Sequence, residues 1–435
     1  MKKCLILLLA ALLFGACDEE DTPVTPEEYA DRTVLVYIAA ENNLTGYSQM
    51  RFADDDLREM KEGSKMLDDR QNLLVYVDKA ENDPPYIARI RNGELVDSFA
   101  LEECLSADPA VLEEMLLYSR MNYPARSYGL VLWGHSNGWV VLSDSVSYAG
   151  TRAYGGDTGN NMSDSAGKYW MNIPSMARAI GHAMGDDHLS FILADCCNFG
   201  CIESAYELRH VTDYLITSPA EIPELGAPYH LIVPLMFDTS ETFYQSVVDA
   251  YFDYYLEEFA NAPTYYFNNK YGDLEGYSIP FAAIKSSELE NLALATADLL
   301  STIPGKLSPA GDFNFDHLVY YDYDRRTSVE YGYDIYHSLK ENTSESDFAK
   351  WEPWFRKAVP YSRFSAKWLS SMNQLIADMQ VFSESTQDYG MVSMFFPRQI
   401  YDNAGQYSSY RILNLNTAIQ AFEWNSVIRW QQYGW

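Results

Sequence analysis

Short apolar runs of strand length alternate with stretches of helical spacing through the first half of the 435-residue chain. Most of these runs are apolar at consecutive positions, which is typical of strands buried on both faces of a parallel sheet. Helices are expected between them, near 46–63 and 109–122, and Asn92-Gly93 predicts a hairpin. The segments that we predict to be strands are 33–40 (TVLVYIAA), 72–79 (NLLVYVDK), 128–133 (YGLVLW), 189–194 (LSFILA) and 213–217 (DYLIT). The pattern predicts an α/β fold whose mainly parallel sheet is covered by helices on both faces.

The second half of the chain is expected to add helices to this sheet. No low-complexity linker or repeat interrupts the sequence, so 32–435 is interpreted as one domain with a C-terminal extension. The elements predicted in this half are helices at 241–259, 288–301 and 328–357, strands near 276–285 and 390–397, and a last helix that ends near Trp430.

The first residues have the pattern of an export signal. Two lysines precede an apolar core that is too short to span a bilayer, and Gly15-Ala16 precede Cys17. This resembles a bacterial lipobox, so we interpret 1–16 as a lipoprotein signal peptide and Cys17 as the lipidated residue of an outer-membrane or cell-surface protein. An ordinary cleaved signal with an incidental cysteine is the alternative. The segment 17–31 is interpreted as an acidic tether.

The formal net charge of −31 limits the partners that the protein could bind. A surface this acidic would not release counterions from phosphates, so nucleic acid is excluded as a partner class. It would also repel anionic membrane surfaces, and we expect contact with the membrane through the lipid anchor only. We expect a monomer that acts on peptide or protein substrates.

Two predicted strands end in residues that could form a catalytic pair. His135 follows the apolar run that ends at Trp133, and Cys197 follows the run that ends at Ala194, where a helix is expected to begin. Neighbouring parallel strands would bring the two side chains together at one edge of the sheet, with His135 as base or acid and Cys197 as nucleophile. The alternative is that each is a buried structural residue.

The two blocks around these residues resemble the clostripain-like cysteine peptidases, relatives of caspases, legumains and gingipains. The blocks stand here as Trp133-Gly134-His135-Ser136-Asn137-Gly138-Trp139 and Asp195-Cys196-Cys197-Asn198-Phe199-Gly200-Cys201-Ile202-Glu203-Ser204-Ala205-Tyr206-Glu207-Leu208. The resemblance implies a caspase-like α/β/α sandwich and a cysteine endopeptidase. It places the catalytic histidine on His135, the nucleophile on Cys197 rather than Cys196, and the acidic residue of the substrate pocket on Asp195.

The chain departs from the family pattern beside each catalytic position. Ser136 replaces a glycine whose backbone N–H is expected to bind the oxyanion together with the N–H of Cys197. Cys196 and Asn198-Phe199 replace the usual neighbours of the nucleophile. A non-catalytic surface lipoprotein of the same fold that binds peptide or glycan therefore stays an alternative, as does an amidase or transpeptidase that uses the same dyad.

Two loops are expected to determine processing and specificity. Relatives mature by cutting themselves between the two blocks, so Arg152 and Lys168 are candidate autocleavage sites, with a plain surface loop as the alternative. By the same resemblance, 217–229 lines the substrate cleft. Glu221 or Glu224 could there join Asp195 in receiving Arg or Lys at P1, unless they are solvated loop carboxylates.

No metal ligand is assigned from the sequence. A zinc site made of Cys196, Cys197 and Cys201 with His182 or His188 is disfavoured, because adjacent cysteines point apart and no paired C-x-x-C is present. Calcium is used by some relatives, but no D-x-D-x-D-G loop occurs here, so it is left as possible only. We interpret Asn42-Asn43-Leu44, which also resembles a family block, as a turn that caps the next helix.

Overall fold

The computed structural model describes residues 29–45, 51–80, 84–139, 153–159, 169–261, 275–324, 329–365, 367–368, 380–381, 388–406 and 414–435. The predicted signal peptide, the lipidation residue Cys17 and the candidate autocleavage residues Arg152 and Lys168 lie outside these residues.

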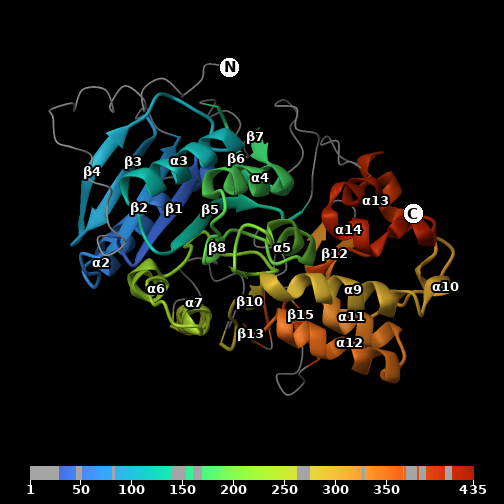
Figure 1. Ribbon diagram of the computed structural model, residues 1–435. Helices are drawn as coiled ribbons and strands as arrows, with labels where there is room; N and C mark the ends of the chain where they lie inside the picture. The colour runs from blue at the N-terminus through green and yellow to red at the C-terminus, as the bar shows by residue number, and fades with distance from the viewer. Residues whose placement is uncertain are drawn as a thin grey trace.

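A central sheet organises the molecule (Figure 1). Its strands follow the order β13-β10-β9-β8-β5-β1-β2-β3-β4, and the five in the middle of the fold pair in parallel. These five are β1 (Arg32–Ala40), β2 (Gln71–Lys79), β5 (Tyr128–Ser136), β8 (Phe191–Asp195) and β9 (Tyr214–Thr217). The predicted α/β fold with a mainly parallel sheet is confirmed.

Antiparallel strands complete both edges of the sheet. At one edge β3 and β4 form the predicted hairpin, whose turn places Asn92 at φ 50° and Gly93 at φ 86°. At the other edge β10 pairs with β9 and with β13. β6 pairs with the last residues of β5, beyond those that pair with β1 and β8, and β7 pairs with β6. Their bounds are β3 (Tyr86–Arg91), β4 (Glu94–Ala100), β6 (Tyr154–Asp157), β7 (Tyr169–Met171), β10 (Phe281–Lys285) and β13 (Tyr361–Arg363).

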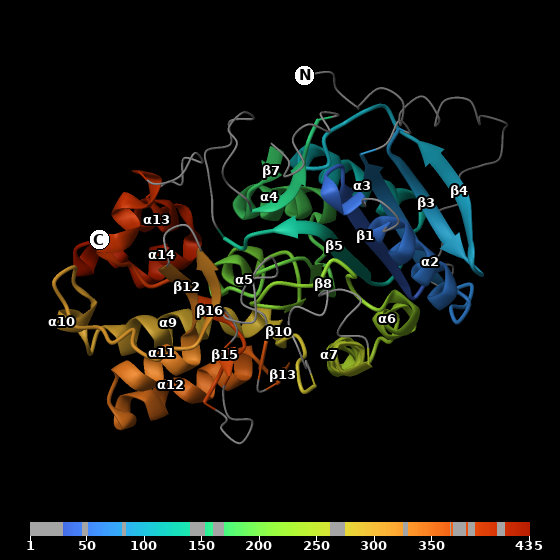
Figure 2. The same ribbon diagram turned by 180° about the vertical axis from the view of Figure 1, so that it is seen from behind.

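Helices cover the two faces of the sheet, as the two figures show from opposite sides (Figures 1 and 2). Alternate residues of β1 go to different cores: Leu35 and Tyr37 to one, Val34 and Val36 to the other. The first core includes residues of α3 (Pro109–Asn122), α4 (Ile173–Met184) and α5 (Ile202–Leu208). The second includes residues of α2 (Phe52–Ser64), α6 (Tyr229–Met236) and α7 (Phe243–Asn261).

The C-terminal part packs beside α5 and is less helical than predicted. Residues 329–334, expected in a helix, form strand β12, because their alternating tyrosines pair with β11. The predicted strand at 390–397 shortens to Ser393–Met394. The remaining elements are η2 (Asn43–Thr45), η3 (Ser286–Glu288), α9 (Leu289–Leu300), α10 (Pro304–Leu307), β11 (Tyr320–Asp324), β12 (Val329–Asp334), α11 (Ile335–Asn342), α12 (Glu345–Ala358), β14 (Lys367–Trp368), β15 (Gln380–Val381), β16 (Ser393–Met394), η5 (Gln399–Gln406), α13 (Leu415–Ala418), η6 (Ile419–Ala421), α14 (Glu423–Ile428) and η7 (Trp430–Tyr433).

The C-terminal part is joined to the segment after β8 by hydrogen bonds that its backbone N–H groups donate. Ser393 N donates to Gly200 O at 2.9 Å, and Phe395 N donates to Oε1 of the buried Glu203 at 2.8 Å. The ring of Trp139, which ends the described segment after β5, meets Phe395 edge-on at 4.9 Å between centroids. The last strand of the chain thus supports both loops at the carboxyl edge of the sheet.

In the described segments, we find no helix of the length and apolarity that crossing a bilayer requires.

Candidate active site

The order in which strands are added to the sheet reverses between β1 and β5. From β1 the next strand, β2, is added on one side, whereas β5, β8 and β9 are added on the other. In open α/β sheets the crevice at the carboxyl ends of two such strands is the usual place for a ligand site. The residues that follow β1, β5 and β8 are therefore the first to consider.

The register of β5 and β8 brings His135 and Cys197 to corresponding positions. Trp133 is paired with Asp195 in the parallel ladder, and His135 and Cys197 each follow two residues later. Neighbouring strands lie about 4.8 Å apart, so the two residues occupy the same edge of the sheet on adjacent strands. Both are half-buried, which leaves each of them partly open to solvent.

Asn43 contacts the histidine and was not recognised from the sequence as a residue of the site. Its Oδ1 lies 2.8 Å from His135 Nε2, and since an amide oxygen only accepts, the ring nitrogen donates. Nδ1 is then the nitrogen without a proton in the neutral ring. The predicted turn is made by Asn42, whose Oδ1 accepts from Leu44 N at 2.8 Å. Asn42 thus makes the predicted turn, and Asn43 makes the contact with the histidine.

Three cysteines lie close together after β8, and burial separates them. Cys196 and Cys201 are each 2% exposed, and burial raises the pKa of the Cys196 thiol well above its usual range and that of Cys201 to about 12. Neither is a thiolate at neutral pH. Cys197 is half-buried, and its Sγ lies 3.4 Å from Ile222 N, which donates to it. Cys197 is therefore the chemically accessible thiol of the three.

The loops after β5 and β8 approach each other closely. Gly138 has φ +65°, and a Cβ there would lie 2.6 Å from Asn198 O. Asn198 itself has φ +55°, and its N donates to Ala220 O at 2.9 Å. Gly200 leaves no room for a side chain either, because a Cβ would lie 2.6 Å from Pro219 N. This packing fixes the turn that carries Cys197.

The backbone N–H of Ser136 points away from β6. Asn137 N donates to Ala153 O at 3.1 Å, which makes these two a hydrogen-bonded pair of the antiparallel ladder. Since such pairs alternate, Ser136 and Tyr154 form a non-hydrogen-bonded pair. The Ser136 side chain is turned to Ala153 O, to which its Oγ donates at 2.7 Å. The main-chain N–H is thus not used in pairing with β6.

Asp195 lies at the end of β8 and is only 4% exposed. Among the described residues its carboxylate accepts from Ala227 N at 2.9 Å, from the Tyr229 hydroxyl at 2.8 Å and from the Tyr251 hydroxyl at 2.9 Å. Burial nevertheless raises the pKa of this carboxyl, and these three donors lower it in part.

Asp56 of α2 is a second buried carboxyl beside Asp195. Its Oδ2 accepts from Trp133 Nε1 at 2.5 Å, and burial, followed by the charge of Asp195, raises its pKa well above the usual range. A Cβ on Gly226 would lie 2.6 Å from Asp56 Oδ2 and 3.1 Å from Asp195 Oδ2. Only a glycine fits between the two acids.

The loop that follows β9 runs along this edge of the sheet. It is in contact with the nucleophile candidate through Ile222, whose N–H reaches Cys197 Sγ. Glu221 and Glu224, predicted to receive a basic P1 side chain, are half-buried in the same loop. The hydrogen bonds to Asp195 given above come from Ala227, Tyr229 and Tyr251.

Comparison with known proteins identifies the family. A family model described as the clostripain family matches residues 36–429. The chain belongs to this family. A search of the curated proteins found no match.

Solved structures are similar to this clostripain-family chain over most of its length. A secreted C11 cysteine protease from Bacteroides thetaiotaomicron, in complex with an irreversible peptide inhibitor, is 29% identical. The alignment covers 92% of this chain and 99% of that one, with a TM-score of 0.69. An inactive zymogen C11 protease from Parabacteroides distasonis is 25% identical over 93% and 99% of the two chains, with a TM-score of 0.66. This chain is thus a cysteine-type endopeptidase of caspase-like fold.

The two histidines considered for the disfavoured zinc site each lie near a carboxylate in this clostripain-family peptidase. His182 is near Glu113 (3.6 Å) and His188 is near Asp213 (3.8 Å), and both are largely exposed. Within the described ranges, the one group of three side chains placed to hold a metal ion is Glu41, Asp78 and Asp157.

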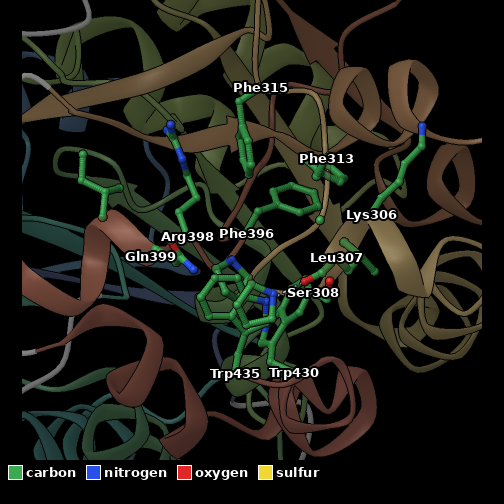
Figure 3. Close-up of a pocket in the computed structure, with 14 residues that line it drawn as sticks. Lys306, Leu307, Ser308, Phe313, Phe315, Phe396, Arg398, Gln399, Trp430 and Trp435 are labelled. Atoms are coloured by element: carbon green, nitrogen blue, oxygen red, sulfur yellow. Dashed lines mark hydrogen bonds between the residues drawn. The ribbon is translucent and has the colours of Figure 1, made fainter.

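A separate cavity of about 280 Å³ lies in the C-terminal part of the peptidase (Figure 3). Figure 3 shows Trp430 and Trp435 together on one side of it, with Phe313, Phe315 and Phe396 opposite. None of its lining residues belongs to β1, β5 or β8, so it is not part of the site at the sheet edge.

Proposed function

We propose that this peptidase cleaves peptide bonds with Cys197 as the nucleophile and His135 as the acid and base. The observation that carries the proposal is the parallel register, which puts both residues two positions beyond the pair Trp133 and Asp195. The hydrogen bond from His135 Nε2 to Asn43 supports it, because it leaves Nδ1 as the nitrogen that can exchange a proton with a thiol.

The reaction follows from these roles. Cys197 Sγ gives its proton to His135 and attacks the carbonyl carbon of the scissile bond. The attack forms an S–C bond and a tetrahedral intermediate, whose C–N bond breaks when His135 gives the proton to the leaving amine. Water, deprotonated by the same imidazole, then releases the acyl group from sulfur. The amide oxygen of Asn43 keeps the ring oriented and stabilises the imidazolium during both acylation of the thiol and release of the acyl group.

Backbone N–H groups would bind the oxyanion. The candidates are the N–H of Ser136, which is not used in pairing with β6, and that of Cys197. Replacing glycine by serine at 136 does not remove this donor, since the side chain is turned to Ala153 O. Oxyanion donors of this kind are worth roughly 3–4 kcal/mol in the transition state.

For the substrate we propose Arg or Lys at P1. Two buried carboxyls, Asp195 and Asp56, lie beside Gly226, and the charge of Asp195 adds to burial in raising the pKa of Asp56. A cationic side chain brought near them would relieve this repulsion, whereas an acidic one would increase it. Because Tyr229 and Tyr251 already donate to Asp195, its charge would act on P1 from a fixed position.

We also propose that the peptidase is exported, lipid-anchored at Cys17 and cut by itself at Lys168 or Arg152. The related protease from Bacteroides thetaiotaomicron is described as secreted. Trp170, just after Lys168, has its ring centroid 6.4 Å from that of His135, so a cut at 168 would free a segment that leads to the site. Intact masses of the wild type and Cys197→Ala tell whether the cut occurs and whether it needs the thiol.

The test of the proposed function is hydrolysis of a P1-varied fluorogenic peptide library. The mature protein is measured under reducing conditions, with Cys197→Ala and Cys196→Ala as matched variants. Turnover after Arg or Lys by the wild type and Cys196→Ala, but not by Cys197→Ala, is expected. Turnover after other residues would overturn the role given to Asp195. Absence of turnover and of labelling by a thiol-reactive peptide would favour a non-catalytic binding protein.

A further inference from the structure

Trp170 lies beside the proposed catalytic histidine and has no part in the reaction described above. Its ring centroid is 6.4 Å from that of His135, and the two ring planes are inclined at 38°. Aromatic rings interact over this range of centroid distances. Trp170 is half-buried, so part of its surface faces solvent next to the catalytic pair. Apolar surface of this kind at an active site is typical of the walls that contact a ligand.

The local sequence of β6 lets the indole come this close. Gly155 is opposite His135 in the β5–β6 ladder and opposite Trp170 in the β6–β7 ladder, so one strand separates the two residues. A Cβ on the next residue, Gly156, would lie 2.8 Å from Trp170 Cη2. Both glycines have a positive φ, of 102° and 77°. The absence of side chains at these two positions leaves the space that the indole occupies.

His135 lies between Cys197 and Trp170. β8, which leads to Cys197, pairs with β5 on one side. β6 is on the other side, near the end of β1, where Asn42 Nδ2 donates to Gly155 O at 3.3 Å. β7 pairs with the opposite edge of β6, and Figure 1 shows β8, β5, β6 and β7 in this order. The nucleophile and the indole thus flank the histidine from opposite sides.

The course of the reaction determines which part of a substrate comes next to the indole. In the proposed mechanism the acyl group stays on Cys197 Sγ, while His135 gives a proton to the leaving amine. The substrate residue that carries this amine is P1′, so the substrate chain continues on the histidine's side of the site. Because Trp170 lies on that side, P1′ is the substrate residue that it is placed to contact.

We propose that Trp170 forms the wall of an S1′ subsite that selects a large apolar or aromatic side chain at P1′. An apolar P1′ side chain would cover the open part of the indole and remove both surfaces from water, whereas alanine would cover little of it. A phenyl ring would in addition gain the favourable geometry of an aromatic pair. This subsite rests on the proposed roles of His135 and Cys197. It makes the choice of the scissile bond depend on the residues on both sides of that bond.

The test uses internally quenched peptides that differ only at P1′, which is Phe, Leu or Ala. P1 is the residue that the P1-varied library finds best. The mature wild type is compared with Trp170→Ala, which removes the wall, and with Trp170→Phe, which keeps an aromatic face. Trp354→Ala changes an exposed tryptophan of α12 and is the matched control. Intact masses show whether each protein is cut near 168, so that proteins in the same state are compared.

The wild type and Trp354→Ala should cleave the Phe peptide with a kcat/KM at least about fivefold above that for the Ala peptide. In Trp170→Ala this ratio should fall below about twofold, and in Trp170→Phe most of it should remain. A loss of the same size on all three peptides would show that Trp170 acts only on the histidine, and would overturn the subsite. So would a ratio that Trp170→Ala leaves unchanged.

A second measurement needs no variant, and so decides the matter if Trp170→Ala does not fold. The α-amine of an amino acid amide competes with water for the acyl group on Cys197, and it must enter where the leaving amine departs. Its nitrogen forms a bond to the carbonyl carbon as the C–S bond breaks, and its proton passes by way of His135 to Sγ. Phenylalanine amide should be incorporated at least about fivefold more than alanine amide at equal concentration.

Equal incorporation of the two amides by the wild type would overturn the subsite. Cleavage of the peptides without regard to P1′ would refute the subsite and leave the proposed function intact. A protein that cleaves none of the peptides would refute the proposed function, and the subsite with it.

Discussion

Asn43 Oδ1 accepts a hydrogen bond from His135 Nε2 at 2.8 Å, across the boundary between β1 and β5. The contact joins residues far apart in the sequence at the point where the order of strand addition reverses. It fixes the ring orientation and the tautomer, and so decides which nitrogen can face a thiol.

Asn43→Ala should therefore lower kcat by about 10- to 100-fold, because the imidazole loses the acceptor that orients it. KM should change little, since no substrate contact is removed. Asn43→Asp keeps an acceptor oxygen at the same place and should recover most of the loss. Steady-state kinetics on one fluorogenic peptide check this, and equal loss in both variants would argue against an orienting role.

Cys196→Ala should keep most of the activity and Cys197→Ala none of it. Cys196 is buried and its pKa is raised well above the usual range, so its thiol is inert at neutral pH. A peptide carrying a thiol-reactive group should label wild type and Cys196→Ala at one site, identified by mass spectrometry. Labelling of Cys196 in either protein would contradict the assignment.

Gly138→Ala should lower peptidase activity strongly and the stability of the fold only moderately. The left-handed φ of +65° costs a non-glycine residue about 1–2 kcal/mol, and the new methyl would lie 2.6 Å from Asn198 O. The turn that carries Cys197 must then shift. Gly305→Ala is the matched control, because no atom lies within 4 Å of its Cβ position. Comparison of kcat/KM with Tm separates the two effects, and an unchanged kcat/KM in Gly138→Ala would show that this contact does not position the nucleophile.

Glu203 should make the protein less stable at alkaline pH. Burial raises its pKa from 4.5 to about 7, so the fold favours the protonated form. Its contribution to stability is present below pH 4.5 and is lost as pH rises through 7, by about 3 kcal/mol in total. Glu203→Gln, which keeps the acceptor for Phe395 N, should raise Tm at pH 8 and have little effect at pH 5. A Tm difference that does not change with pH would contradict this reading.

The local pattern of apolar runs and capping residues was enough to predict the central strands and the helix at 109–122. The strands at 33–40 and 72–79 are right to within one residue, because uniform apolar runs occur where both faces of a strand are buried. The helix at 109–122 is right at both ends, since Asp108 accepts from Ala110 N and Pro109 occupies its first position. His135 and Cys197 were placed at one sheet edge for the same reason, as ends of adjacent buried strands.

Long-range contacts account for what the sequence did not predict. An asparagine after a strand has the same local pattern whether it caps a turn, as Asn42 does, or reaches a histidine, as Asn43 does. Residues 329–334 pair with β11 and β16, and only these partners make them a strand. The group of Glu41, Asp78 and Asp157 has no spacing that a motif could show. Whether Asp195, Glu221 and Glu224 select a basic P1 stays a prediction.

The contacts between β16 and the segment after β8 depend on residues that are translated late. A chain made from its N-terminus contains the histidine and the nucleophile long before Ser393 and Phe395 exist to bind Gly200 and Glu203. Until those last residues are translated, the turn that carries the thiol lacks part of its scaffold. We therefore expect a nascent or truncated chain that lacks these residues to be less active than the full-length peptidase, so that activity would develop only near the end of synthesis.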